Sequence, residues 1–209
     1  MFQVAKRRIA ILEPLTVFVL IMAYIWDLRY RHHEVWVGIL GIVLLSHMVR
    51  RERAAALGFH LRNLRQCLDE FLPMLGFLGL VMVAAGILLQ TTRPIPFGDA
   101  FLAWFGYLPW GTFQQYLLNG YFLNRLGRVM APRHASIASA VLFSGVHLPN
   151  WFLMGITLLA GYYSARLYLR HRNLYFLGIA HATLGFLLFL VVPDSISHHL
   201  VIGPGWFGR

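Results

Sequence analysis

Charged residues are scarce in this sequence, and their scarcity argues against a soluble protein. They make up 12% of the 209 residues, about half the share that a soluble globular domain carries. Hydrophobic residues reach 58% instead. The apolar stretches run on for roughly 15 to 20 residues without the alternation that membrane barrels show. The sequence therefore predicts one all-α domain, a polytopic membrane helix bundle.

Lysine and cysteine are almost absent as well. Lys6 is the one lysine among 18 basic residues, which face 8 acidic ones, and Cys67 is the one cysteine. A single cysteine excludes an internal disulfide. A net charge of +10 would suggest a nucleic-acid partner in a soluble protein. Here the arginines gather at the ends of apolar segments, so we expect membrane lipid as their partner and no nucleic acid.

The apolar pattern predicts about seven transmembrane helices in a single domain, residues 1–209. The predicted spans are residues 9–26, 35–49, 71–89, 100–123, 135–147, 151–169 and 174–192. Leucines at helical spacing, with arginines between them, predict an additional cytoplasmic interfacial helix over residues 54–67. The domain thus divides into N-terminal spans (1–99), a core (100–192) and a tail (193–209).

The distribution of arginine predicts the orientation of these spans. With the N-terminus inside, most of the 18 basic residues fall on the cytoplasmic side of the seven-span topology. We expect an integral protein of a bacterial inner membrane, with its N-terminus in the cytoplasm and its C-terminus outside.

Three polar islands interrupt the apolar spans, and polar side chains in hydrocarbon often mark a functional site. They contain Gln114, Gln115 and Asn119, then His147, then His181. At about 1.5 Å of rise per residue, each island lies roughly 13 to 20 Å from the cytoplasmic arginines. That depth is near the middle of a core about 30 Å thick, so the islands are predicted to face one cavity. Alternatively, the amides only join helices, and the histidines are packed core residues.

The order and spacing of the islands resemble the CAAX protease and bacteriocin-processing family, also called Abi, which includes type II CAAX prenyl endopeptidases. The resemblance covers about residues 100–192. The family's first motif is Glu-Glu, three residues, then Arg-Gly, where this chain reads Gln114-Gln115-Tyr-Leu-Leu-Asn-Gly. The second motif, Phe-x-x-x-His, is matched by Phe143 and His147. The third begins with His181, but glycine replaces the usual asparagine at position 185.

The resemblance implies an intramembrane endopeptidase that acts on a membrane-anchored or C-terminal peptide. In the family, glutamate and histidine activate water, and the remaining histidine and asparagine stabilise the oxyanion. Carried over by position, the predicted catalytic residues are Gln114, Gln115, His147 and His181. The predicted substrate-binding residues are Asn119, Phe143 and Asn150.

Replacement of both glutamates changes the chemistry that these positions support. A glutamine amide cannot accept a proton as a general base, and it is a poor zinc ligand. The sequence therefore assigns no cofactor, and a divalent metal held by His147 and His181 stays open as an alternative that is not favoured.

Several alternatives follow from this replacement. Either histidine acts as the base while the glutamines orient water or the carbonyl, or the protein binds a transmembrane or lipidated peptide without cutting it. A third alternative recruits a carboxylate from Glu13, Asp69 or Glu70. A Ser144 nucleophile is weaker, because the serine lacks the Gly-x-Ser-Gly context of rhomboid-type peptidases.

Overall fold

The computed structural model describes the backbone of residues 2–208 and the side chains of residues 9–208. The chain is 81% helical, and no strand occurs between residues 2 and 208. Three helical segments are long and apolar enough to cross a membrane, namely Ile9–Arg31, Leu64–Leu88 and Leu174–Val191. The prediction of an all-α membrane bundle is confirmed, and the protein is an integral membrane protein.

The predicted spans correspond closely to the observed helices. The α-helices are α1 (Phe2–Ala23), α2 (Arg29–Arg31), α3 (Val35–Val49), α4 (Leu64–Leu88), α5 (Phe97–Gln115), α6 (Asn124–Leu126), α7 (Pro132–Gly145), α8 (Trp151–His171), α9 (Leu174–Val191) and α10 (Asp194–Ser197). Two π-helical segments, Tyr24–Leu28 and Tyr116–Leu123, continue α1 and α5. Short 3₁₀ turns cover Ala54–Leu57, His198–Leu200 and Gly203–Phe207.

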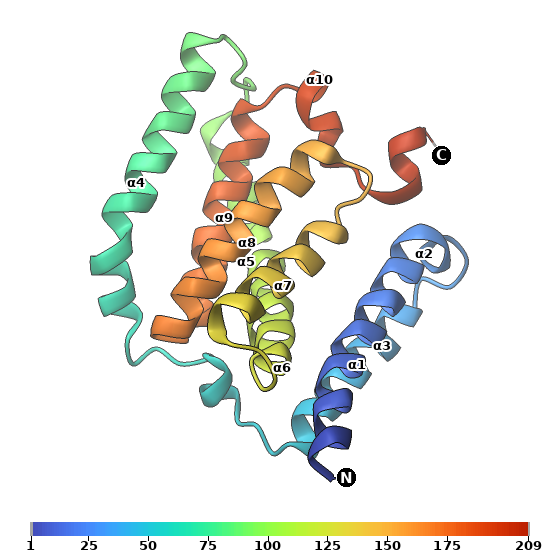
Figure 1. The fold of residues 1–209 in the computed structure, drawn as a ribbon. Coiled ribbons are helices and arrows are strands. Elements are labelled where there is room, and N and C mark those ends of the chain that lie inside the picture. The colour runs from blue at the N-terminus through green and yellow to red at the C-terminus, as the bar shows by residue number, and fades with distance from the viewer. Residues whose placement is uncertain (1, 209) are drawn as a thin grey trace.

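The helices form a central group with one unit on either side (Figure 1). Helices α5, α7, α8 and α9 make the centre, where α7 packs on α8 and α5 packs on α9. Helices α1 and α3 form an N-terminal hairpin on one side, and α4 lies along α9 on the other. The tail after α9 folds back over the upper end of α8 in this view.

The predicted interfacial helix over residues 54–67 is wrong. The structure has a 3₁₀ turn at Ala54–Leu57 that ends at Gly58 with φ +101°, a backbone conformation that favours glycine. The Gly58 carbonyl accepts a 2.9 Å hydrogen bond from the Leu174 N–H, and a Cβ at Gly58 would lie 2.6 Å from the Arg172 carbonyl oxygen. Docking of this loop against the start of α9 overrides the helical leucine spacing, so α4 begins only at Leu64.

Small residues bring α5 and α9 into close contact, as is common between membrane helices. A Cβ added to Gly111 of α5 would lie 3.2 Å from Ala182. A Cβ added to Gly178 of α9 would lie 2.1 Å from Thr112 Oγ1 and 2.8 Å from Thr112 Cα. The two backbones therefore approach each other at Gly178, and this contact fixes the position of α9 beside the first polar island.

The close contact at Gly178 yields a stability prediction. Because the added methyl group overlaps the Thr112 backbone, Gly178→Ala is expected to destabilise the protein by about 1–3 kcal/mol, the usual cost of overpacking. Gly155→Ala in α8 is the matched control, since no atom lies within 4 Å of its added Cβ. Thermal unfolding in detergent measures both variants. Equal midpoints for the two would contradict the packing described here.

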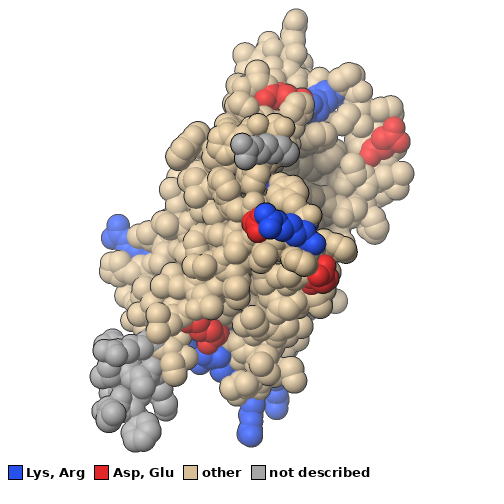
Figure 2. Space-filling view, turned by 90° about the vertical axis from the view of Figure 1, so that its right-hand side faces the viewer, with Lys and Arg blue, Asp and Glu red and all other residues tan. Residues whose placement is uncertain are grey.

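The outer surface suits a lipid environment. Large apolar side chains remain exposed on several helices, including Phe97 at 87%, Leu88 at 82% and Met48 at 72%. Figure 2 shows that charged side chains cover little of the face formed by the N-terminal hairpin and the tail. Such a surface is stable when lipid chains cover it.

A buried arginine joins the N-terminal hairpin to the core. Arg125 of α6 is fully buried, and its guanidinium donates to Glu13 Oε1 at 3.1 Å, to Glu52 Oε2 at 2.9 Å and to Ser46 Oγ at 2.8 Å. The second carboxylate oxygen of Glu13 accepts from Arg50. The cluster thus links α1, α3 and the following loop to α6.

Glu52 lies in the loop after α3, and Arg125 controls its charge. Partial burial alone raises the pKa of the Glu52 carboxyl, but hydrogen bonds from Arg125 and His47 outweigh burial and lower the pKa to about 2. Glu52 is therefore ionised at neutral pH and compensates the buried Arg125 charge.

Candidate functional site

The first and third polar islands meet in a hydrogen-bonded chain of side chains. Gln115 Nε2 lies 3.1 Å from His181 Nδ1, and the Gln115 carbonyl oxygen accepts a 2.7 Å bond from Asn119 Nδ2. An amide nitrogen can only donate, so His181 Nδ1 is the acceptor and its proton resides on Nε2. Gln115 and Asn119 thereby fix both the tautomer and the orientation of the His181 ring.

A change of helix type places Asn119 in this chain. The α-helix α5 ends at Gln115 and continues as a π-helix over Tyr116–Leu123, a feature often found at functional sites. Asn119 is fully buried in this segment, and its amide also lies 3.5 Å from Ser164 Oγ of α8. Within the described part of the chain, the Asn119 carbonyl oxygen has no hydrogen-bond partner. Gln114 is half-buried, and the side-chain hydrogen bonds found among residues 9–208 do not include it.

The second island lies where α7 ends. His147 occupies the turn after Gly145, and its Nδ1 lies 2.7 Å from the Phe143 carbonyl oxygen. Because a carbonyl can only accept, the Nδ1–H donates and Nε2 carries the free lone pair. The Phe143 ring contacts both imidazoles, with centroid distances of 5.2 Å to His147 and 6.1 Å to His181.

The structure therefore brings five predicted site residues together: Gln115, Asn119, Phe143, His147 and His181. The two histidines have opposite tautomers. His147 presents a lone pair at Nε2, and His181 presents an N–H at Nε2. A proton acceptor and a hydrogen-bond donor are the two kinds of group that acyl transfer uses.

Asn150 has a structural position that its predicted role in substrate binding did not anticipate. It is fully buried, its Oδ1 caps α8 by accepting from Leu153 N at 3.1 Å, and its Nδ2 donates to Ser197 O and Val201 O. The side-chain amide thus caps α8 through its oxygen and holds the tail through its nitrogen, so the structure gives Asn150 a packing role, and its role in substrate binding stays a prediction.

The carboxylates considered as replacements are engaged elsewhere. Glu13 binds Arg125 and Arg50, and Glu70 binds Arg170 at 2.7 Å. Asp69 is exposed and lies 3.7 Å from Arg65. Among the described residues, no hydrogen bond or ion pair joins these carboxylates to His147 or His181.

Ser144 is also engaged in a structural contact. Its hydroxyl donates to the Met154 carbonyl at 2.8 Å, so its proton goes to the backbone of α8 rather than to an imidazole.

The donor set does not fit a divalent metal. Within residues 9–208 no group of three or more His, Cys, Asp or Glu side chains is arranged to hold one. His147 and His181 would supply two nitrogen ligands, and the nearby amides are weak ligands beside the carboxylates or thiolates that metal sites use.

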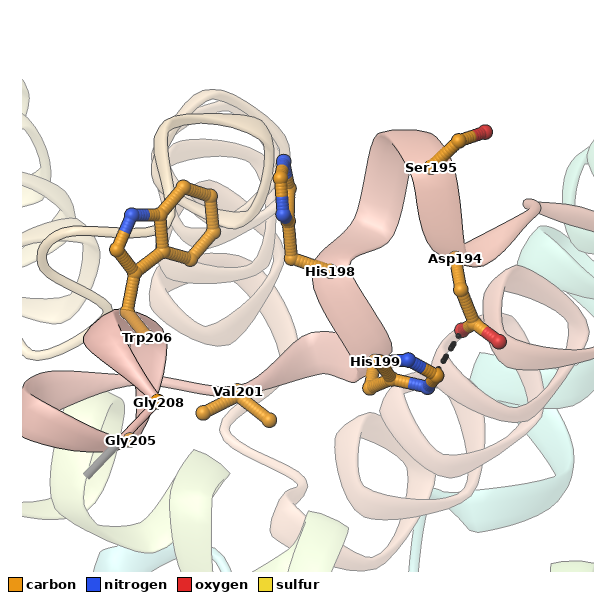
Figure 3. A pocket seen from close by; sticks show the side chains of 8 residues that line it. All are labelled: Asp194, Ser195, His198, His199, Val201, Gly205, Trp206 and Gly208. Atoms are coloured by element: carbon orange, nitrogen blue, oxygen red, sulfur yellow. Dashed lines mark ion pairs between the residues drawn. The ribbon is translucent and has the colours of Figure 1, made fainter.

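A separate pocket of about 420 Å³ lies in the tail (Figure 3). Its lining includes Trp206 and His198, whose rings are 4.0 Å apart, and His199, which pairs with Asp194. None of the predicted site residues lines it. Asp194 is also held by Arg93, whose hydrogen bond lowers the pKa of that carboxyl. The tail pocket is thus separate from the candidate site at His147 and His181.

Two residues near the site were missed by the sequence analysis. Tyr107 lies seven residues before Gln114, and its ring is 6.2 Å from the His181 ring. Helical spacing could have found it, because residues seven apart share a helix face. Ser164 reaches Asn119 from α8, and the sequence contains no signal for that contact.

The two histidines and the amide chain lie within the part of the chain that matches a known family. Residues 96–187 match the family model described as Type II CAAX prenyl endopeptidase Rce1-like. The resemblance found in the sequence is therefore confirmed over these residues. No curated protein and no solved structure matches the chain.

Proposed function

We propose that this protein is an intramembrane endopeptidase that hydrolyses a membrane-anchored or C-terminal peptide. The observation that carries the proposal is the His147 tautomer. Its Nδ1–H is bound to the Phe143 carbonyl, so Nε2 keeps its lone pair, and the Phe143 ring contacts both His147 and His181 inside the matched residues 96–187. An imidazole lone pair is the usual proton acceptor at neutral pH, and no carboxylate is needed for this step.

The proposed reaction assigns a role to each imidazole. His147 Nε2 accepts a proton from water as the water oxygen bonds to the scissile carbonyl carbon. The carbonyl oxygen becomes an oxyanion, which accepts a hydrogen bond from His181 Nε2–H. His147 then returns the proton to the leaving amide nitrogen as the C–N bond breaks, giving a carboxylic acid and an amine. Gln115 and Asn119 keep His181 in the donor tautomer throughout.

A second candidate function is peptide binding without hydrolysis. The observation that favours it is the amide chain itself, because Gln115 and Asn119 provide donors and acceptors that suit a peptide backbone but supply no base. In this alternative the two histidines only line the binding site.

One assay separates the two functions. The purified protein in detergent is incubated with membrane-anchored peptides, prenylated and unprenylated, while binding and products are followed separately. Endopeptidase activity predicts defined fragments from at least one peptide. Binding without fragments, in wild type as well as in His147→Ala and His181→Ala, would reject the proposal and favour the second candidate.

Gln115→Glu tests whether the missing carboxylate limits the reaction. A carboxylate at the position of Nε2 can only accept, so it would draw the His181 proton to Nδ1 and remove the Nε2–H donor from the oxyanion. On the proposed mechanism cleavage is therefore expected to fall about 10²-fold, whereas a rise would mean that the missing carboxylate limits the reaction and that His181 is not the oxyanion donor. Gln114→Glu is the matched control, with a smaller effect, because Gln114 forms no bond to His181. An unchanged rate in Gln115→Glu would mean that the tautomer of His181 does not matter to the reaction.

We also propose that the N-terminus faces the cytoplasm of a bacterial cell. The support is the distribution of arginines, many of which lie on segments at the lower end of the molecule in Figure 1, such as the loop after α3 and the end of α8. With seven spans, a cytoplasmic N-terminus places the C-terminus outside the cytoplasm. A reporter that is active only outside the cytoplasm should therefore be active when it is fused to the C-terminus. Activity of a cytoplasm-specific reporter there would reverse the orientation.

A further inference from the structure

Tyr107 of α5 reaches the helical turn that follows His181 on α9. Gly185 lies four residues after His181, and a Cβ added there would be 3.1 Å from Tyr107 Cε1 and 3.4 Å from the Tyr107 hydroxyl oxygen. The phenol therefore occupies the space that a side chain at position 185 would take. Its ring lies at 6.2 Å and 41° from the His181 imidazole.

The Tyr107 hydroxyl is free to bind a ligand. The side-chain hydrogen bonds that join α5 to α9 connect Trp104 to Thr183 and Gln115 to His181, and none among the described residues uses this hydroxyl. A phenol within an apolar bundle normally has a partner for its O–H. Tyr107 is half-buried, so a group entering beside His181 can supply that partner.

The phenol lies between two helices that the close packing at Gly178 holds in place. Gly111, one turn after Tyr107, contacts Ala182, which is next to His181. The hydroxyl is consequently preorganised relative to the His181 ring, as oxyanion donors must be. At neutral pH a phenol stays protonated and acts as a donor.

We propose that the Tyr107 hydroxyl is a second donor to the oxyanion, acting beside His181 Nε2–H. Gly185 stands where the third family motif usually has asparagine, and the phenol takes the place of that amide. The phenol keeps its proton and forms only a hydrogen bond to the oxyanion. This inference rests on the proposed endopeptidase function.

Tyr107→Phe tests the inference in the full-length protein. The variant is expected to lower kcat about 10²-fold with little change in KM, since the lost bond forms only in the transition state. Tyr163→Phe, on an exposed tyrosine of α8, is the matched control and should match wild type. An unchanged kcat, or a loss confined to KM, would overturn the inference.

A double variant provides a rescue experiment. Tyr107→Ala removes both the donor and the ring that blocks position 185, so kcat should fall. Adding Gly185→Asn to this variant introduces an amide into the vacated space and should recover part of the rate. A merely structural role of Tyr107 predicts no recovery of kcat in the double variant. A double variant as slow as Tyr107→Ala, together with a wild-type rate in Tyr107→Phe, would reject the proposal.

A binding measurement keeps the two proposals distinguishable. A peptide trifluoromethyl ketone forms a tetrahedral hydrate that mimics the intermediate, and its affinity is compared with that of the parent peptide. Tyr107→Phe should weaken the ketone about 10²-fold and leave the parent peptide unchanged. If wild type cleaves nothing, the endopeptidase proposal fails, whereas equal weakening of both ligands, or of neither, overturns the role of Tyr107.

Discussion

Arg125→Met is expected to destabilise the folded protein by about 3–5 kcal/mol, the usual cost of removing one partner from a buried ion pair. The methionine would leave the partly buried carboxylates of Glu13 and Glu52 without the guanidinium that binds both. Arg50 and Arg128 would still contact them, but from positions at the edge of the cluster. The N-terminal hairpin should then separate from the core more readily. Unfolding by denaturant in detergent measures the loss.

Arg128→Met is the matched control for Arg125. Arg128 also binds Glu52, but its side chain is 45% exposed, so solvent screens the pair and removal should cost about 1 kcal/mol or less. Adding Glu13→Gln and Glu52→Gln to Arg125→Met removes the uncompensated charges and should restore much of the stability. If Arg125→Met and Arg128→Met cost the same, the buried cluster does not join hairpin and core as described.

His147→Ala is expected to reduce cleavage by about 10³-fold, within the range for loss of a general base. Its Nε2 holds the free lone pair of the site, and Gln114 and Gln115 cannot replace it. Substrate binding should persist, because Gln115, Asn119 and Phe143 remain. The measurement is single-turnover cleavage of a membrane-anchored peptide at saturating enzyme.

His134→Ala serves as the control for this prediction. His134 is exposed at the start of α7, on the same helix as Phe143, and its removal should leave the rate unchanged. A His147→Ala variant that cleaves as fast as wild type would exclude His147 as the base. A variant that fails to bind peptide would instead indicate that the histidine holds the site together.

The sequence predicted the spans and the meeting of the islands, because both depend on local patterns. Hydrophobicity locates helices such as Val35–Val49 to the residue, and the spacing of the polar residues gives their common depth. The contact between Gln115 and His181 follows from those depths, since a polar group in hydrocarbon must find a partner.

The features that escaped the sequence depend on contacts between distant segments. In the sequence, Arg125 cannot be told apart from the other arginines at the ends of spans. Its partners Glu13 and Glu52 are more than 70 residues away and are brought to it only by the fold. The role of Asn150 depends on the return of the tail, and the loop at Gly58 depends on the start of α9. The π-helix after Gln115 carries no distinct residue pattern. Such pairings are set by tertiary packing, which periodicity does not encode.

The most direct test of the account is cleavage of a membrane-anchored peptide in water enriched in ¹⁸O, with mass analysis of the fragments. Water activated by His147 should place one ¹⁸O atom in the new carboxyl group of the N-terminal fragment, and His147→Ala should yield almost no fragment. Fragments without ¹⁸O, an equal yield of fragments from His147→Ala, or no fragment from the wild-type protein would contradict the account.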